Sequence, residues 1–285
     1  MGTSQSSKGP GSGIAMVPPW TPAPPADDSP ENGTEAEDTV GNAGVPTPQV
    51  SPPVVPPPHV ASPARFAGAR RALGEFTRSG DSRDLQRSMG HYVRTGYGGA
   101  TTTTRRFGGT AATASALDGA LARVAEGQPA QTGSSLDPAL LAGRNVQEVM
   151  NAVVEAVRPI DGTQDAEAER AAIRDSLTEL LTRFPEADLL NLDPEQRAFA
   201  IENFTAIDVF RRFELDLGKT ILDNAPNAAT ALSRLKEVRG YVKQSVAAAF
   251  RKLRDAGRSL TGNRIGRVVR DALKETFQVF EGYAE

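Results

Sequence analysis

Apolar side chains return every three or four positions from residue 137 to the end of the chain, a spacing that places them on one face of an α-helix. Asp137 and Asp193 are each followed by proline, which pairs an N-cap residue with a side chain suited to the first helical turn. No stretch alternates convincingly with a period of two, so the sequence predicts an all-α fold. The five apolar stripes are Val146, Val149, Met150, Val153, Val154 and Val157; Ile173, Leu177, Leu180, Leu181 and Phe184; Phe199, Phe204, Ile207, Phe210, Phe213 and Leu217; Leu232, Leu235, Val238, Val242, Val246, Phe250 and Leu253; and Ile265, Val268, Val269, Leu273, Phe277 and Phe280.

Three further helices are predicted ahead of these stripes. The first is expected to stop near Gly80, and the second to begin after the N-cap residue Asp81. An Ala-rich amphipathic segment at 110–126 is expected to end near Gly127. The apolar faces of the three helices are Phe66, Leu73 and Phe76; Leu85, Met89 and Val93; and Leu117, Leu121 and Val124.

Residues 96–109 interrupt this helical pattern with glycine at both ends and four consecutive threonines between them. The segment is interpreted as a loop that links two helices. The alternative is a phosphate site, in which the threonine hydroxyls and the paired Arg105 and Arg106 would hold the anion beside Tyr97 and Phe107. The segment has no G-x-x-x-x-G-K-[ST] pattern and no strand-like run before it, so the linking loop is favoured.

Residues 1–64 have a different composition, with 15 of the 21 prolines of the chain and few large apolar side chains. Such a segment cannot bury enough surface to offset the entropy of ordering it. We therefore expect a flexible tail over 1–20, a Pro-rich disordered linker over 21–64 and an all-α helical domain over 65–285. Trp20 closes a short apolar cluster and is a candidate docking anchor, with a loosely packed linker residue as the alternative.

Charge is distributed unevenly around the net value of −3. Segment 1–64 is acidic, with one basic and six acidic residues. Segment 65–106 has nine basic and three acidic residues, and segment 234–274 has twelve basic and three acidic residues. Basic segments can contact nucleic-acid phosphates, and Arg264, Arg267 and Arg270 are the candidate contacts. No known recognition module is present, so a solvated or protein-docking face is the alternative.

The residue types exclude several kinds of chemistry. The chain has no cysteine and two histidines, which excludes thiolate sites and makes a histidine-based metal site or catalytic triad unexpected. Carboxylates are expected on helix faces opposite the apolar stripes, where their charge is solvated. We find no dinucleotide, kinase or hydrolase motif, and predict a protein that is not an enzyme and has no metal or cofactor. With no 18-residue apolar stretch and no secretory signal pattern, it is expected to be cytoplasmic without a membrane partner.

The amine at the start of the chain offers a different function. Gly2 is small enough to permit removal of Met1, which would expose an unhindered α-amine. An α-amine has a pKa of about 7.7–8, so a tenth or more is neutral and nucleophilic near pH 7, whereas a lysine amine near 10.4 is almost wholly protonated. A partner enzyme that needs an amine acceptor would find it here. A frayed terminus and an N-myristoylation pattern, M-G-x-x-x-[ST], are the alternatives.

Two parts of the chain carry a family resemblance. One is the start, with Gly2, Thr3, Ser4, Ser6, Gly9 and Pro10, followed by Pro-Pro-Trp at 18–20. The other is the series Ala-Arg-Arg-Ala-Leu-Gly at 69–74, His-Tyr-Val-Arg-Thr-Gly-Tyr-Gly-Gly at 91–99 and Arg-Arg-Phe-Gly-Gly-Thr at 105–110. Over roughly 1–20 and 65–115 the chain resembles the QatB family of the bacterial Qat (QatABCD) anti-phage defence system.

The resemblance implies companions and a role. The companions are an ATPase (QatA), a QueC-like protein (QatC) and a TatD-like nuclease (QatD). QueC-like enzymes use ATP to activate a carboxylated deazaguanine for attack by a nitrogen nucleophile. The resemblance implies a non-catalytic component of a bacterial system, where myristoylation is not expected. From this family context and the chemistry of the terminal amine, we infer that the chain binds the QueC-like partner through the tail and is modified at Gly2. The alternative is a nucleic-acid-binding adaptor that delivers phage DNA to the nuclease through residues 234–274, Arg105 and Arg106.

Overall fold

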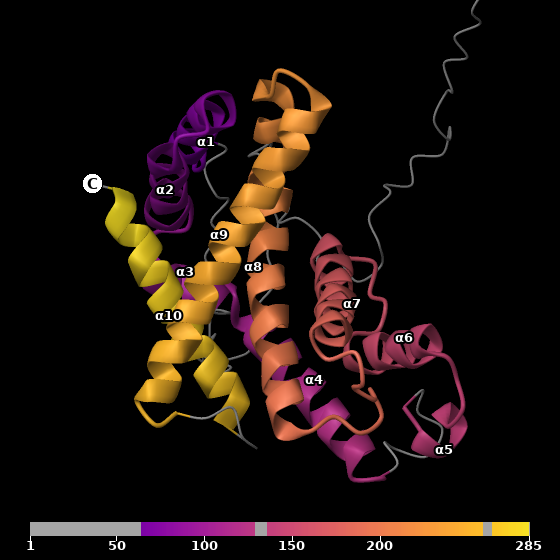
Figure 1. Cartoon of the computed structure of the whole chain (residues 1–285). Coiled ribbons are helices and arrows are strands. Elements are labelled where there is room, and N and C mark those ends of the chain that lie inside the picture. The colour runs from indigo at the N-terminus through magenta and orange to yellow at the C-terminus, as the bar shows by residue number, and fades with distance from the viewer. Residues whose placement is uncertain (1–63, 129–135, 259–263, 285) are drawn as a thin grey trace, which may run out of the picture. The chain divides into compact units, whose positions relative to one another are not determined.

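The structure, a computed structural model, describes residues 64–128, 136–258 and 264–284. These residues form helices and, within those ranges, no strand, which confirms the all-α prediction (Figure 1). The predicted tail and linker up to residue 63, together with Gly2, Thr3, Ser4, Ser6, Gly9, Pro10 and Trp20, lie outside the described residues. The predicted boundaries at residues 20 and 64 therefore stay predictions.

Helix α8, Pro194–Asn224, is the centre of the helical body. Asp193 caps its N-terminus as predicted: the Asp193 Oδ1 atom accepts from the Gln196 N–H at 2.8 Å, and the Gln196 side chain accepts from the Asp193 N–H at 3.0 Å. Between residues 200 and 210 nearly every side chain is buried, including those on opposite faces of the helix. A helix buried all round must have neighbours on every side.

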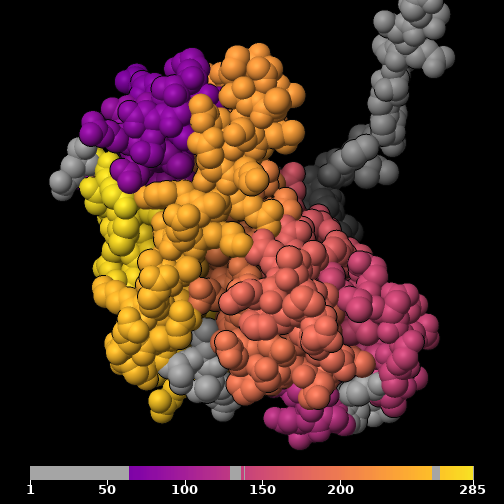
Figure 2. Space-filling view, viewed as in Figure 1, coloured from indigo at the N-terminus to yellow at the C-terminus, as the bar shows by residue number. Residues whose placement is uncertain are grey.

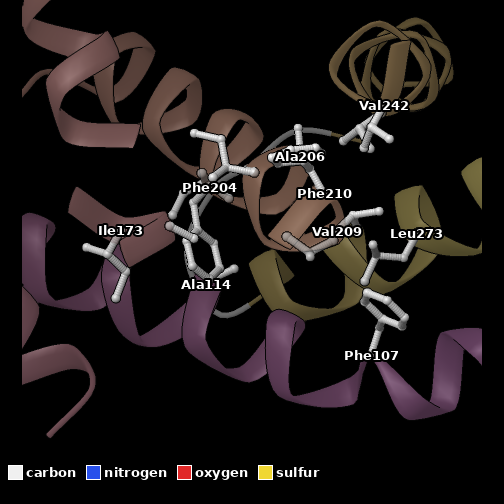
Figure 3. Close-up of a cluster of buried hydrophobic side chains, with 14 of the residues drawn as sticks. Phe107, Ala114, Ile173, Phe204, Ala206, Val209, Phe210, Val242 and Leu273 are labelled. Carbon is white, nitrogen blue, oxygen red and sulfur yellow. The ribbon is translucent and has the colours of Figure 1, made fainter. Parts of the chain in front are cut away.

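The neighbours of α8 are α7 (Gln164–Arg183), α9 (Ala228–Asp255), α4 (Gly108–Ala125) and α1 (Ala67–Ser79). Helix α10, Ile265–Glu281, packs on α9, α3 and α4 and is followed by the 3-10 turn η3, Gly282–Ala284. Figure 3 shows side chains of α8 meeting those of α4, α7, α9 and α10 in one hydrophobic cluster. The stripes that predicted these helices thus form a common core.

Helix α1 and helix α2, Ser82–His91, form a pair (Figure 2). Helix α1 packs on α8 and α9, and helix α2 packs on α10 and η3. Gly80 ends α1 in the left-handed region at φ 76°, which glycine adopts without the strain of a side chain. The Asp81 side chain then accepts from the Arg83 N–H at 2.9 Å and caps α2. Both predictions about this turn are confirmed.

The prediction of a loop over residues 96–109 is wrong. A π-helical turn η1, Tyr92–Gly96, is followed by α3, Ala100–Arg106, and α4 begins at Gly108 after the single break at Phe107. The Thr103 and Thr104 hydroxyls donate to backbone carbonyls four residues earlier, at 2.9 and 2.8 Å. These bonds satisfy the hydroxyls inside the helix, so their burial in the fold outweighs the low helix propensity of threonine.

Asp137 does not cap the helix that carries the stripe from Val146 to Val157, although its place ahead of that stripe suggested it. Asp137 begins only the short α5, Pro138–Leu141, and Gly143 turns the chain at φ 77°. A capping box between Asn145 and Glu148 then begins α6, Val146–Val157. Val146 is 54% exposed and Leu232, in the first turns of α9, is 67% exposed, so these two stripe residues are not core residues.

Candidate functional site

Arg105 and Arg106 lie side by side in the last turn of α3, both exposed and without an ion pair among the described residues. Because neighbouring residues of a helix point in different directions, the two side chains line different cavities. The candidate set Tyr97, Arg105, Arg106 and Phe107 is therefore divided between two sites by α3.

The larger cavity is a groove between α3, the start of α4 and α10, with a volume of about 610 Å³, which we call the α3–α10 groove. Arg105 on α3 faces the same space as Arg270 and Lys274 on α10, although 165 residues of chain separate Arg105 from Arg270. All three cations are exposed and have no ion pair within the described part of the chain. The groove is lined by Thr101, Thr104, Arg105, Gly108, Arg270, Asp271 and Lys274.

The smaller cavity, about 280 Å³, lies between α3, the start of α7 and α8, and we call it the α3–α8 hollow. The hydroxyls of Tyr92 and Tyr97 both donate to the Asp216 Oδ2 atom, at 2.9 and 2.7 Å. Burial and the charge of Asp216 raise the pKa of Tyr97 to about 12, so this hydroxyl remains a donor at neutral pH. The hollow is lined by Arg65, Tyr97, Arg106, Phe107, Asp165, Arg212, Leu215 and Asp216.

The aromatic rings near the hollow are engaged by the protein itself. The Arg65 guanidinium lies 5.5 Å from the centre of the Tyr97 ring, and that of Arg212 lies 5.3 Å from the centre of the Phe107 ring. Phe107 is 1% exposed and packs on Phe277 with ring centres 4.9 Å apart. Phe107 is therefore a core residue that joins α3 to α10.

Beneath the hollow lies a buried polar cluster that the sequence did not predict. Asp208 on α8 is fully buried, accepts from the Thr110 hydroxyl at 2.6 Å and lies 3.7 Å from the Arg212 Nε atom. Glu169 on α7 is 3% exposed and pairs with Arg212 at 3.1 Å and with Arg158 at 2.8 Å. The expectation that carboxylates lie on solvated helix faces is thus wrong for these two, whose charges join α4, α7 and α8.

Burial raises the pKa of Asp208 to about 6, an effect partly offset by Arg212 and the Thr110 hydroxyl. Between about pH 4 and pH 6 the folded chain holds a proton that the unfolded chain has released, so this group makes the free energy of unfolding fall as the pH rises. Raising the pKa from 3.8 to about 6 corresponds to a total fall of about 3 kcal/mol in the free energy of unfolding as the pH rises.

We predict that Asp208→Asn lacks this pH dependence. The free energy of unfolding of the variant, measured in urea relative to wild type, should rise by up to about 3 kcal/mol between pH 4 and pH 7. Asp223→Asn, which removes an exposed carboxylate from the same helix, is the control and should show no such trend. A difference between Asp208→Asn and wild type that does not vary with pH would contradict the prediction.

The basic segment 234–274 is only partly available for an external partner. Arg239 and Lys243 pair with Glu179 on α7, and Arg254 pairs with Glu202 on α8 at 2.6 Å. These residues hold α9 to its neighbours. The three predicted nucleic-acid contacts, Arg264, Arg267 and Arg270, are exposed and have no ion pair within the described residues. Only Arg270 lines the α3–α10 groove.

The described residues carry neither a cluster of metal ligands nor a membrane-spanning helix. They contain no group of three or more histidine, aspartate or glutamate side chains placed to hold a metal ion. None of their helices is long and apolar enough to span a membrane.

The sequence from α3 almost to the end of α10 decides the family. A family model described as the Qat anti-phage system associated protein QatB matches residues 98–280. The chain belongs to the QatB family. The match contains the elements that form both cavities, apart from Arg65 and Tyr97. The comparisons with curated proteins and with solved structures found no match. The family assignment makes this chain a component of the Qat anti-phage defence system.

Proposed function

We propose that this QatB-family chain is a non-catalytic defence component that binds the QueC-like companion through residues 1–20 and offers the Gly2 amine as the acceptor of its product. The observation that carries the proposal is the glycine at position 2, which begins a segment where glycine recurs at positions 9, 11 and 13. Such a segment can enter a narrow channel as an extended peptide, because glycine adds no side chain.

The proposed reaction forms an amide. The companion would use ATP to activate a carboxylate as its adenylate, and the neutral Gly2 amine would attack the carbonyl carbon. The new C–N bond forms, the bond from carbon to the AMP oxygen breaks, and the amine loses a proton. A terminal amine suits this step because its pKa of about 7.7–8 leaves a nucleophilic fraction near neutral pH.

The length of the segment suits delivery to a buried active centre. Eighteen residues separate Gly2 from Trp20, and at about 3.3 Å per residue they extend over roughly 60 Å. An anchor at Trp20 would hold the amine near the active centre at an effective concentration of about millimolar. Binding at Trp20 and reaction at Gly2 are therefore separable by mutation.

We predict that Trp20→Ala weakens binding to the QueC-like companion by about tenfold or more, because a tryptophan anchor carries a large share of binding energy. The measurement is calorimetric titration of the full chain with the purified companion. Thr21→Ala, a truncation at the next position, is the matched control and should bind as wild type does. Equal affinity of Trp20→Ala and wild type would contradict Trp20 as the anchor.

A second candidate function is that of an adaptor that brings nucleic acid to the TatD-like nuclease. The free cations on α3 and α10 favour it, since Arg105, Arg267 and Arg270 have no ion pair among the described residues. This candidate requires that the full chain binds an oligonucleotide at low salt. Failure to bind at low salt would exclude it and would leave the acceptor function untouched.

A further inference from the structure

We infer that the α3–α10 groove binds the phosphates of a single nucleic-acid strand, independently of base sequence. The inference goes beyond the acceptor function and deepens the adaptor candidate, on which it rests, by giving it one site and one kind of strand. It assigns the contacts to Arg105, Arg270 and Lys274. The sequence predicted only arginines of this segment as nucleic-acid contacts, so Lys274 is a new candidate.

The α3–α10 groove is bordered by cations from two helices. Arg270 and Lys274 are four residues apart and so lie on one face of α10, about 6 Å apart along its axis. Arg105 faces the same groove from α3, which packs against α10. These three exposed cations, which have no ion pair among the described residues, thus border one groove, an arrangement that attracts a chain of phosphates.

The one acid in the groove does not cancel this charge. Asp271 pairs with Arg258 at 2.7 Å, so its carboxylate is already neutralised by a cation that is not among the lining residues. The Thr104 hydroxyl donates to the Ala100 carbonyl, which leaves the exposed Thr101 as the hydroxyl available to a phosphate oxygen. The groove therefore offers a net positive wall and one exposed threonine, Thr101.

The shape of the groove favours a single strand. Proteins that read duplex DNA insert a protruding helix or ribbon into its grooves, whereas single strands are held in positively charged channels. A concavity of about 610 Å³ between two helices is of the second kind. None of its lining residues is aromatic, so bases have no stacking platform there and binding depends on the phosphates.

The α3–α8 hollow does not compete for this role. Arg65, Arg106 and Arg212 line it, but Arg212 pairs with Asp165 at 3.1 Å and with Glu169, and Asp216 adds a further negative charge. Arg106, although adjacent to Arg105 in sequence, lines this hollow and not the groove. Arg105 and Arg106 are thus expected to differ in their effect on strand binding.

The test is binding of the full chain to a labelled single-stranded oligonucleotide, measured by fluorescence anisotropy over a range of salt concentrations. For single strands, log K falls against log salt with a slope of about −0.7 per neutralised phosphate, so Arg270→Gln/Lys274→Gln should make the slope shallower by about 1.4. Between about 50 and 200 mM salt this corresponds to about a sevenfold smaller loss of affinity than in wild type.

Three comparisons keep the inference falsifiable. Lys219→Gln/Lys236→Gln removes the same charge from exposed positions on α8 and α9 and should leave the slope unchanged. If Arg264→Gln/Arg267→Gln changes the slope and the groove variant does not, the groove is wrong and the adaptor candidate stands. A duplex of the same sequence that binds as tightly as the strand would overturn the single-strand assignment. No binding at about 50 mM salt would overturn both the groove and the adaptor candidate.

Discussion

Replacement of Gly2 by valine should abolish modification of the N-terminus while leaving the helical body as stable as in wild type. Valine at this position crowds the amine at the atom that must attack, and it hinders removal of Met1. The variant is expressed with the QueC-like companion and its intact mass is compared with that of wild type. We expect wild type to gain the mass of the added acyl group and the Gly2→Val variant to show no such gain.

Ser7→Val is the matched control for this substitution, because it places the same branched side chain in the same segment but away from the amine. It should be modified as wild type is. Modification of the Gly2→Val variant at its N-terminus or at Lys8 would show that the companion does not depend on an unhindered terminal glycine, and would contradict the acceptor proposal.

Phe107→Ala should lower the free energy of unfolding by about 3–5 kcal/mol, the usual cost of removing a phenylalanine ring from a packed core. The ring is 1% exposed and packs on Phe277, with Tyr97 6.1 Å away between ring centres. Its loss would leave a cavity where α3 meets α10. Urea unfolding followed by circular dichroism measures the change.

Arg106→Ala is the control for Phe107→Ala, because it truncates the preceding side chain of α3, which is exposed and has no ion pair among the described residues. The expected change is within about 0.5 kcal/mol. Two equal and small effects would indicate that Phe107 belongs to a surface loop, as the sequence suggested, and not to the core.

Helix ends were the most predictable part of this fold. Gly80 and the Asp193-Pro194 pair act through the local backbone alone, so their effect can be deduced from sequence without knowledge of the tertiary structure. The apolar stripe of α10 is equally local, and its six predicted residues are all buried. These features need no partner outside their own helix to be recognised.

The helix α3 was missed because its stability is not local. Glycine and threonine have low helix propensities, and only the burial of Thr103 and Thr104 and the packing of α3 on α10 favour the helix over a loop. The break between α5 and α6 does have a local signal, namely Gly143 and the capping residue Asn145. It was missed because the apolar stripe alone was used to place the helix.

The candidate site could be predicted only in part. Arg105 and Arg270 were identified separately as basic residues, but no sequence pattern relates residues that are 165 positions apart. Asp208 carried a weak signal, because it is a charged residue inside the apolar stripe of α8. A carboxylate inside an apolar stripe is expected to be buried. Asp208 is buried because α8 has neighbours on every side.

The central claim is that the Gly2 amine is an acceptor, and mass spectrometry of the N-terminal peptide tests it most directly. The peptide is taken from cells that express the complete Qat system and resist phage, and from cells that lack the QueC-like companion. We expect a Gly2 amine that carries an added acyl group in the first sample and is free in the second. A fully processed but unmodified Gly2 in demonstrably resistant cells would contradict the claim.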